Sequence, residues 1–338
     1  MGENSINNSL DFQTMIHPIP LRAKLSNDDY FIWGASMVKG KEGNYHLFYS
    51  RWPKSKGFQA WVTDSEIAHA VAKDSLGPYH FVDVALPARG KKYWDGLCTH
   101  NPTVHKFDNK YYLYYMGNTG NGVNTEGLNW IHRNNQRIGV AVSNSPNGPW
   151  KRFNKPLIDT SPDSTAMDAL CVSNPSITPR PDGGYLMVYK AVGKKRKLPF
   201  GGPVVHMVAT SQNPTGPFKK YDKPIFTVKN SDFPAEDPSI WWEGGNYWAI
   251  IKDQHGAFTG AGRSLALFKS SDGFTWNVAD YPLVSKLNIH WADGNVQKLN
   301  SLERPQIWLD EKGEPKILFL AATMDRKTNS FNVHIPLK

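Results

Sequence analysis

Short apolar runs separated by turn residues recur along the chain at a nearly constant interval. Four runs open with a proline that is followed by a polar residue and then by Val or Ile, at Pro102, Pro175, Pro238 and Pro305. A fifth run keeps this pattern at Ala35 without the proline, and the successive spacings are 67, 73, 63 and 67 residues. Regular periods of this kind indicate repeated supersecondary units. The sequence therefore predicts five copies of one unit.

Each copy carries the pattern of an antiparallel hairpin followed by further strands. A second apolar run follows every opening, and turn residues such as Asp108-Asn109 separate the two runs. A third apolar run follows in the first four copies. A short fourth strand is expected near residues 155–158 and 223–226.

Four antiparallel strands in each of five copies predict an all-β protein, a five-bladed β-propeller that spans residues 1–338. A segment of about residues 8–22 is expected to supply the outer strand of the last blade. Closing the ring in this way leaves no unpaired strand edge at the junction. An irregular β-sandwich is the alternative architecture.

Composition agrees with many short strands and excludes several classes of protein. The chain has 24 Pro, 28 Gly, 12 Trp, 14 Tyr and 16 Phe, which disfavours a helical bundle. The two cysteines, Cys98 and Cys171, cannot make a disulfide scaffold, and no Cys/His spacing is typical of zinc. No apolar run approaches the roughly 20 residues that span a bilayer, so we expect no membrane span. The sequence leaves the compartment and the oligomeric state open.

The net charge of +9 changes the expected partner only slightly. Basic runs such as Lys194-Lys195-Arg196-Lys197 are short and lie among acidic residues, so a nucleic acid is not expected. An anionic glycan, such as a uronate or a sulfated sugar, fits the charge better. The basic run itself is expected to be a solvated loop.

Candidate functional residues follow from propeller geometry. The first strand of each blade lines the central channel, and the loop before it opens on the same face as the loop between the second and third strands. Carboxylates, amides, cations and aromatic rings gather at these places, which is typical of a carbohydrate pocket. The candidate substrate-binding residues are Trp33, Arg51, Asp95, His100, Asn101, Asn174, Lys190, His255 and Arg304. The loops between second and third strands also bring Trp52 and Arg326 to this face.

Several candidates have a structural alternative. His100 can be a buried structural histidine, and Asn101 and Asn174 can bond to the backbone of a neighbouring blade. Asp95 and Asp168 stand at the same offset before their prolines, so they can be repeated caps of the loop as well as functional groups. No ligand cluster indicates a metal, and no cofactor is expected.

The segment Ala235-Glu236-Asp237-Pro238 resembles a motif of the five-bladed propeller glycosidases, which include glycoside hydrolase families 43, 32, 68 and 117. The resemblance implies hydrolysis of a glycosidic bond, with Glu236 as the general acid. Aromatic neighbours such as Trp241 are expected to raise the pKa of Glu236 so that it is protonated near neutrality. In this resemblance His255 is an alternative proton donor.

Two carboxylates of the family pattern are replaced in this chain. Gly34 stands where these enzymes have the Asp of the first blade, and Asn174 stands where they have the Asp of a middle blade. Glycoside hydrolysis ordinarily needs a second carboxylate. The candidates for that catalytic role are Glu303, Asp168 and Asp237, with Asp95 as a further one.

The sequence thus predicts an exo-acting glycoside hydrolase that removes a terminal sugar, anionic or unusual, from an oligosaccharide. Two alternatives from other classes remain open. One is a carbohydrate-binding propeller that does not hydrolyse its ligand. The other is a polysaccharide lyase that acts on uronates, in which a His or Lys abstracts a proton.

Overall fold

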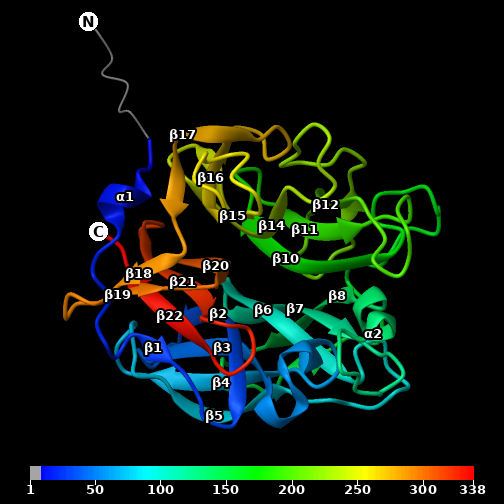
Figure 1. The fold of residues 1–338 in the computed structure, drawn as a ribbon, viewed down its shortest axis with the longest axis horizontal. Coiled ribbons are helices and arrows are strands. Elements are labelled where there is room, and N and C mark those ends of the chain that lie inside the picture. The colour runs from blue at the N-terminus through cyan, green and yellow to red at the C-terminus, as the bar shows by residue number, and fades with distance from the viewer. Residues whose placement is uncertain (1–8) are drawn as a thin grey trace, which may run out of the picture.

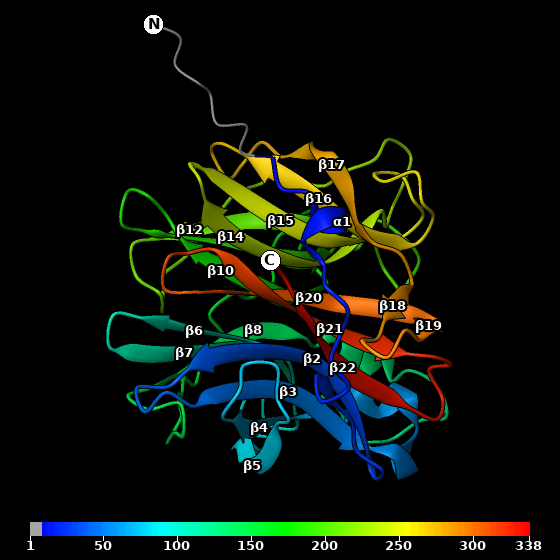
Figure 2. The ribbon, with the colours of Figure 1, turned by 90° about the vertical axis from the view of Figure 1, so that its left-hand side faces the viewer.

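Five antiparallel sheets of four strands each surround a central channel in the computed structural model, which describes residues 9–338 (Figures 1 and 2). Blade 1 contains β2 (Tyr30–Lys39), β3 (Tyr45–Pro53), β4 (Glu66–Ala72) and β5 (His80–Leu86). Blade 2 contains β6 (Cys98–Phe107), β7 (Lys110–Asn118), β8 (Arg137–Ser143) and β9 (Lys151–Arg152). Blade 3 contains β10 (Cys171–Pro179), β11 (Tyr185–Val192), β12 (Val204–Ser211) and β13 (Lys219–Lys220). The predicted five-bladed β-propeller is confirmed.

The remaining two blades complete the ring. Blade 4 contains β14 (Ala235–Glu243), β15 (Asn246–Asp253), β16 (Ser264–Ser270) and β17 (Asn277–Ser285). Blade 5 contains β20 (Ser301–Leu309), β21 (Pro315–Thr323), β22 (Ser330–Pro336) and β1 (Lys24–Leu25). Outside the blades lie the hairpin β18 (Asn288–His290) and β19 (Val296–Lys298), the helices α1 (Phe12–Met15) and α2 (Trp130–Asn134), and the 3₁₀ turns η1 (Lys54–Lys56) and η2 (Phe58–Val62).

The two ends of the chain close the ring in blade 5, because β1 pairs with β22. The closing strand lies at 24–25, just beyond the predicted range 8–22, and Asn8 lies outside the described residues. Pro18 and Pro20 lack the N–H that a strand ladder needs, which explains this displacement. Figure 2 shows α1 and the segment after it running along the outside of the sheets beside the C-terminus.

The fourth strands of blades 2 and 3 also differ from the prediction. They lie at β9 and β13, before the predicted positions 155–158 and 223–226, which contribute only the single bridges Ile138 to Ile158 and His206 to Ile225. Pro156 and Pro224 fall inside the predicted strands and interrupt them. The outer edge of these blades is therefore short.

Apolar side chains from neighbouring blades form the core between the sheets, while repeated hydroxyl groups join the first strands. Ser36 accepts a hydrogen bond from the backbone N–H of Val104, and Ser176 accepts one from that of Ile240, each 2.9 Å long. The first strands thus stay in register around the channel, which places equivalent residues of the five blades at the same depth. No helix within residues 9–338 is long and apolar enough to cross a membrane.

Candidate active site

Every first strand is interrupted at the same place by a residue in the left-handed backbone region. The φ angles there lie between 45° and 56°, and the pairing with the second strand shifts in register at this point. Such a bulge lets two consecutive residues reach the same region. Residues with side chains rarely adopt this conformation, and it concentrates at functional sites. The five residues are Gly34, Asn101, Asn174, Asp237 and Arg304.

These five residues, the axial ring, lie around the channel, and side-chain hydrogen bonds link four of them. Asn101 Nδ2 donates to Asn174 Oδ1 at 2.8 Å, and Asn174 Nδ2 donates to Asp237 Oδ1 at 2.7 Å. Arg304 Nη1 reaches the same Asp237 oxygen at 3.5 Å. A Cβ atom on Gly34 would lie 3.3 Å from Asn101 Oδ1 and 3.5 Å from Arg304 Cβ. The Arg304 side chain thus fills the space beside Gly34, and the ring forms the floor of a cavity.

A cavity of about 160 Å³ lies above this floor. The residues just before the ring residues, among them Trp33, His100, Glu236 and Glu303, contribute to its lining. One wall is aromatic: the Trp33 and Phe58 rings lie 5.7 Å apart, and the Trp61 ring lies 5.0 Å from His100. Flat apolar rings beside convergent polar groups can bind one face of a sugar.

Glu236 is held by cations through both carboxylate oxygens. Lys190 Nζ donates to Oε1 at 2.7 Å, while Lys252 Nζ at 3.3 Å and Gln254 Nε2 at 3.0 Å donate to Oε2. Burial alone would raise the pKa of Glu236, but the attraction of Lys190 and Lys252 outweighs burial and lowers this pKa. The prediction that aromatic neighbours raise the pKa of Glu236 is therefore wrong, because two ammonium groups contact its carboxylate directly.

Glu303 shares Lys252 with Glu236. Lys252 Nζ donates to Glu303 Oε1 at 2.6 Å, and Arg326 Nη2 donates to the same oxygen. Within the described residues Glu303 Oε2 accepts no hydrogen bond. Burial alone would lower the pKa of Lys252, but its attraction to Glu236 and Glu303 raises that pKa instead. Lys252 is therefore a permanent cation between two carboxylates.

Asp237 has the opposite electrostatic character to Glu236. Its Oδ1 accepts the bonds from Asn174 and Arg304, and within residues 9–338 its Oδ2 accepts none. Burial and the negative charge of Glu236 raise the pKa of Asp237 to about 6. Two adjacent carboxyl groups in one cavity are thus driven toward different protonation states, which is the arrangement that separates an acid from a base.

Eight of the sequence-predicted site residues line this cavity. They are Trp33, His100, Asn101, Asn174, Lys190, Glu236, Asp237 and Glu303. Arg304 was predicted to bind substrate, but it is almost fully buried beneath the cavity as part of the floor.

Four other sequence-predicted site residues do not line this cavity. Arg51 pairs with Glu66 at 2.8 Å and lies over the Tyr30 and Phe81 rings. His255 is exposed in the loop after β15 and does not line the cavity.

The two equivalent aspartates are also outside the cavity. Asp168 pairs with Lys220 at 2.7 Å beside an outer groove. Asp95 is fully buried, where it binds Arg89 at 2.5 Å and accepts a hydrogen bond from the Tyr115 hydroxyl at 2.7 Å. The alternative interpretation of these residues as structural anchors of the loops fits their contacts.

Replacing Tyr115 with phenylalanine should lower the free energy of unfolding by about 1.5–3 kcal/mol, because the buried Asp95 carboxylate loses a donor. The substitution should leave substrate binding unchanged, since neither residue lines the cavity. Urea denaturation and ligand titration of the same preparation check both parts. A variant of normal stability with weakened binding would contradict the structural role of Asp95.

Lys252 is central to the site but is not among the residues predicted above. A signal was present, since Lys190 and Lys252 each stand five residues after the tyrosine that opens the second strand. In the structure they pair across the hairpin with Ser173 and Glu236 respectively. Comparing the second strands position by position would have found it.

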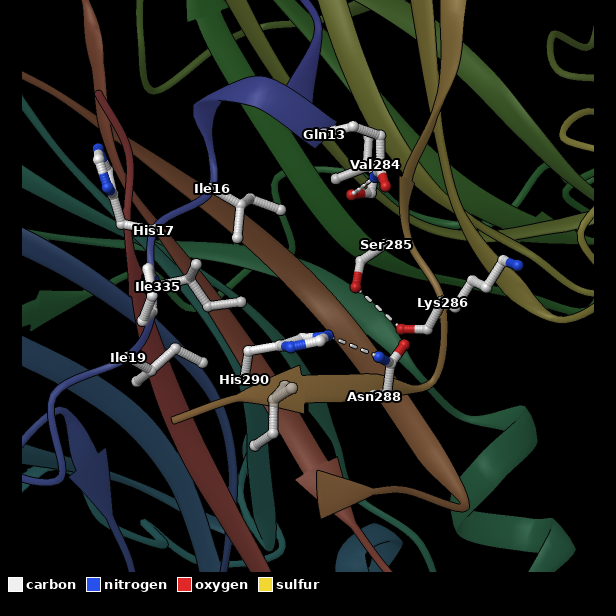
Figure 3. A pocket seen from close by; sticks show the side chains of 12 residues that line it. Gln13, Ile16, His17, Ile19, Val284, Ser285, Lys286, Asn288, His290 and Ile335 are labelled. Atoms are coloured by element: carbon white, nitrogen blue, oxygen red, sulfur yellow. Dashed lines mark hydrogen bonds between the residues drawn. The ribbon is translucent and has the colours of Figure 1, made fainter. Parts of the chain in front are cut away.

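Two of the larger hollows lack this chemistry. One of about 450 Å³, drawn in Figure 3, lies between the N-terminal segment and β18, and none of its lining residues is a carboxylate. Its polar groups include His17, His290 and Lys286 (Figure 3). The other, of about 760 Å³, lies at the opposite end of the first strands, where Asp310 caps a turn and Glu311 pairs with Lys39 on the surface. The described residues contain no group of three or more His, Cys, Asp or Glu that could hold a metal ion.

Fold and site together define a five-bladed propeller with a cavity at one mouth of its channel, lined by carboxylates, their paired cations and aromatic rings. No protein-family model matches the chain, and no curated protein matches it in sequence. Among solved structures, a family 117 glycoside hydrolase of the marine bacterium Zobellia galactanivorans has a TM-score of 0.65 and 17% identity, covering 92% of this chain and 85% of that one. An α-L-arabinofuranosidase from Lactobacillus brevis has a TM-score of 0.58 and 12% identity, covering 96% and 94%. The arabinanase Arb43A of Bacillus subtilis has a TM-score of 0.55 and 15% identity, covering 90% and 96%. The chain has the fold of these glycoside hydrolases.

Proposed function

We propose that the protein is a glycoside hydrolase that removes a terminal sugar, with Asp237 as the proton donor and Glu303 as the second carboxylate. The observation that carries the proposal is that Asp237 and Glu303 each keep one carboxylate oxygen without a hydrogen bond in the described cavity, whereas both oxygens of Glu236 are occupied. The shared fold with glycoside hydrolases supports the reaction class.

In this mechanism the C–O bond of the glycoside breaks as Asp237 Oδ2 transfers its proton to the leaving oxygen. Glu303 Oε2 acts in one of two ways. It attacks the anomeric carbon to form a glycosyl ester, which water then hydrolyses with Asp237 accepting the proton of that water, or it accepts a proton from the water that attacks this carbon. The net change adds one water across the bond. Glu236 does not react. Burial of Asp237, together with the negative charge of Glu236, raises the pKa of Asp237 so that it stays protonated at mildly acidic pH.

The size and closure of the cavity support action at a chain end. Its volume of about 160 Å³ is below the roughly 300–1,000 Å³ typical of ligand pockets. The axial ring closes its floor, so a glycan cannot thread through the channel at this point. One sugar unit therefore fits inside, and the rest of the substrate must lie outside the mouth.

The lyase alternative has one observation in its favour. Burial lowers the pKa of His100 well below its usual range, so this ring is neutral, and its Nδ1 contacts the Ser65 hydroxyl at 2.7 Å. A neutral imidazole can abstract a proton. A lyase must also neutralise the substrate carboxylate, however, and the lining cations Lys190, Lys252 and Arg326 all pair with protein carboxylates.

A panel of oligosaccharides read by mass and by ultraviolet absorbance distinguishes these reactions. We expect release of a monosaccharide with the mass gain of one water. An unsaturated, ultraviolet-absorbing product would establish the lyase instead, and saturable binding without any product would establish a binding protein.

The kcat/KM of the hydrolase should fall as the pH rises above about 6, by tenfold per pH unit, because Asp237 must carry a proton to act as the acid. The raised pKa places this loss on the alkaline side, since deprotonation removes the reactive form. A pH profile of kcat/KM reports the free enzyme and checks the prediction. A profile that stays level up to pH 8 would be inconsistent with Asp237 as the donor.

A further inference from the structure

The cavity itself offers no unpaired cation to an acidic sugar. Lys190 contacts Glu236 at 2.7 Å, Lys252 contacts Glu303 at 2.6 Å, and Arg326 also contacts Glu303. Displacing one of these carboxylates would leave it buried without its partner, which is costly. An anionic group of the substrate therefore has to be bound outside the cavity.

Unpaired cations lie on the loop between β11 and β12, which leaves β11 where that strand pairs with the start of β10. Lys194, Lys195 and Lys197 are exposed, and within the described residues none of them forms an ion pair, whereas Arg196 pairs with Asp232 at 2.5 Å. The loop begins two residues after β11, the strand that carries Lys190 into the cavity.

Backbone hydrogen bonds give this lysine loop a defined shape. Gly202 N donates to Gly193 O at 2.7 Å, and Gly201 N donates to Lys197 O at 3.0 Å. The loop therefore returns on itself and presents its lysines from a fixed base.

An apolar ridge adjoins the lysine loop, because Phe200 follows the lysines and packs against α2. The Trp130 and Phe200 rings lie 5.9 Å apart, and the Arg133 guanidinium lies over both and donates to Phe200 O at 2.7 Å. Ile131 is 58% exposed and Phe200 46% exposed. Part of the ridge comes from α2, which ends two residues before the cavity residue Gln136.

We propose that this rim, made of the lysine loop and the ridge, binds the part of the substrate beyond the terminal sugar, and that the substrate is an acidic oligosaccharide. The carboxylate or sulfate of the next sugars binds Lys194, Lys195 and Lys197, while a sugar face packs on Phe200. The proposal rests on the proposed function in assigning the terminal sugar to the cavity. It places the acidic group on the leaving portion of the substrate.

Direct binding measurements on the full chain test this assignment without requiring turnover. The probes are oligogalacturonides and sulfated galactan oligosaccharides, each beside its carboxyl-reduced or desulfated counterpart. A variant with Lys194, Lys195 and Lys197 changed to serine is compared with a control in which Lys41, Lys110 and Lys312 are changed to serine. The control residues are equally exposed, lie at the opposite ends of the blades and remove the same charge.

We expect the first triple variant to bind one acidic probe about tenfold more weakly and the control variant to bind it nearly as the wild type does. The acidic probe whose binding is weakened shows whether the loop binds a carboxylate or a sulfate. Phe200→Ala should weaken acidic and neutral probes alike, because packing on a ring does not depend on charge.

Equal weakening by the two triple variants, or no preference of the wild type for either acidic probe over its neutral counterpart, would overturn the proposal. Product analysis of the same samples keeps the two proposals apart. Binding that depends on the lysine loop with no product would refute the hydrolase alone, and hydrolysis with binding that is unchanged in the first triple variant would refute the acidic substrate alone.

Discussion

Replacing Asp237 with asparagine lowers kcat/KM for an oligosaccharide by about 10²–10⁴-fold, the usual contribution of a positioned proton donor. Asparagine keeps the size of the side chain and can still accept the hydrogen bond from Asn174 Nδ2, so the axial ring is retained. The loss therefore falls on proton transfer and appears in kcat more than in KM. Steady-state kinetics on the released sugar measure it.

Glu236→Gln is the matched control for this experiment. Removing the charge of Glu236 removes one of the causes that raise the pKa of Asp237, so the alkaline limb of the pH profile should move to lower pH while activity in acid persists. If Glu236→Gln abolishes turnover at every pH and Asp237→Asn does not, the roles proposed for the two residues are reversed.

Replacing Lys252 with methionine should lower the free energy of unfolding by about 3 kcal/mol at neutral pH, because a buried ion pair loses one partner. Glu236 and Glu303 would then face each other without the cation between them. Urea denaturation at pH 7 and pH 5 measures the effect, which should shrink at the lower pH as the unpaired carboxylates take up protons.

A second substitution tests the cause of this instability. Adding Glu303→Gln to Lys252→Met removes one of the repelling charges, so the double variant should be more stable than Lys252→Met alone. A Lys252→Met protein with wild-type stability at neutral pH, or a double variant that is still less stable, would contradict the bridging role of Lys252.

The repeat allowed the fold to be predicted from the sequence. Proline openings and turn pairs recur at a fixed offset, so the five hairpins and the identity of the inner strands followed from local pattern alone. The short outer strands did not, because Pro156 and Pro224 interrupt the ladder at places where the apolar pattern continues. The closing strand moved beyond the predicted segment for the same reason.

The site could be predicted only in part from the sequence. The position of a residue in its strand indicates how deep in the channel it lies, but it does not indicate which residue of another blade it contacts. Glu236 and Asp237 line the cavity, yet their electrostatic character depends on Lys190 and Lys252 from the second strands of two blades. Asp95 had the spacing of a functional residue, but Arg89 and the Tyr115 hydroxyl bind it outside the cavity.

Gly34 shows what a missing residue can indicate. From the sequence, Gly34 could be recognised only as the absence of a carboxylate in the first blade. In the structure the side chain of Arg304 lies where a Cβ at this position would point, and its guanidinium contacts Asp237. The space beside Gly34 is therefore filled by a side chain from blade 5.

The measurement that tests the central claim most directly is the dependence of kcat/KM on the leaving group. A series of substrates that share the terminal sugar and carry alcohols of decreasing pKa is compared for the wild type and Asp237→Asn. The account predicts a shallow dependence for the wild type, since Asp237 protonates the leaving oxygen, and a steep one for the variant, with near-normal rates on the most acidic alcohols. The same dependence in both proteins would contradict it.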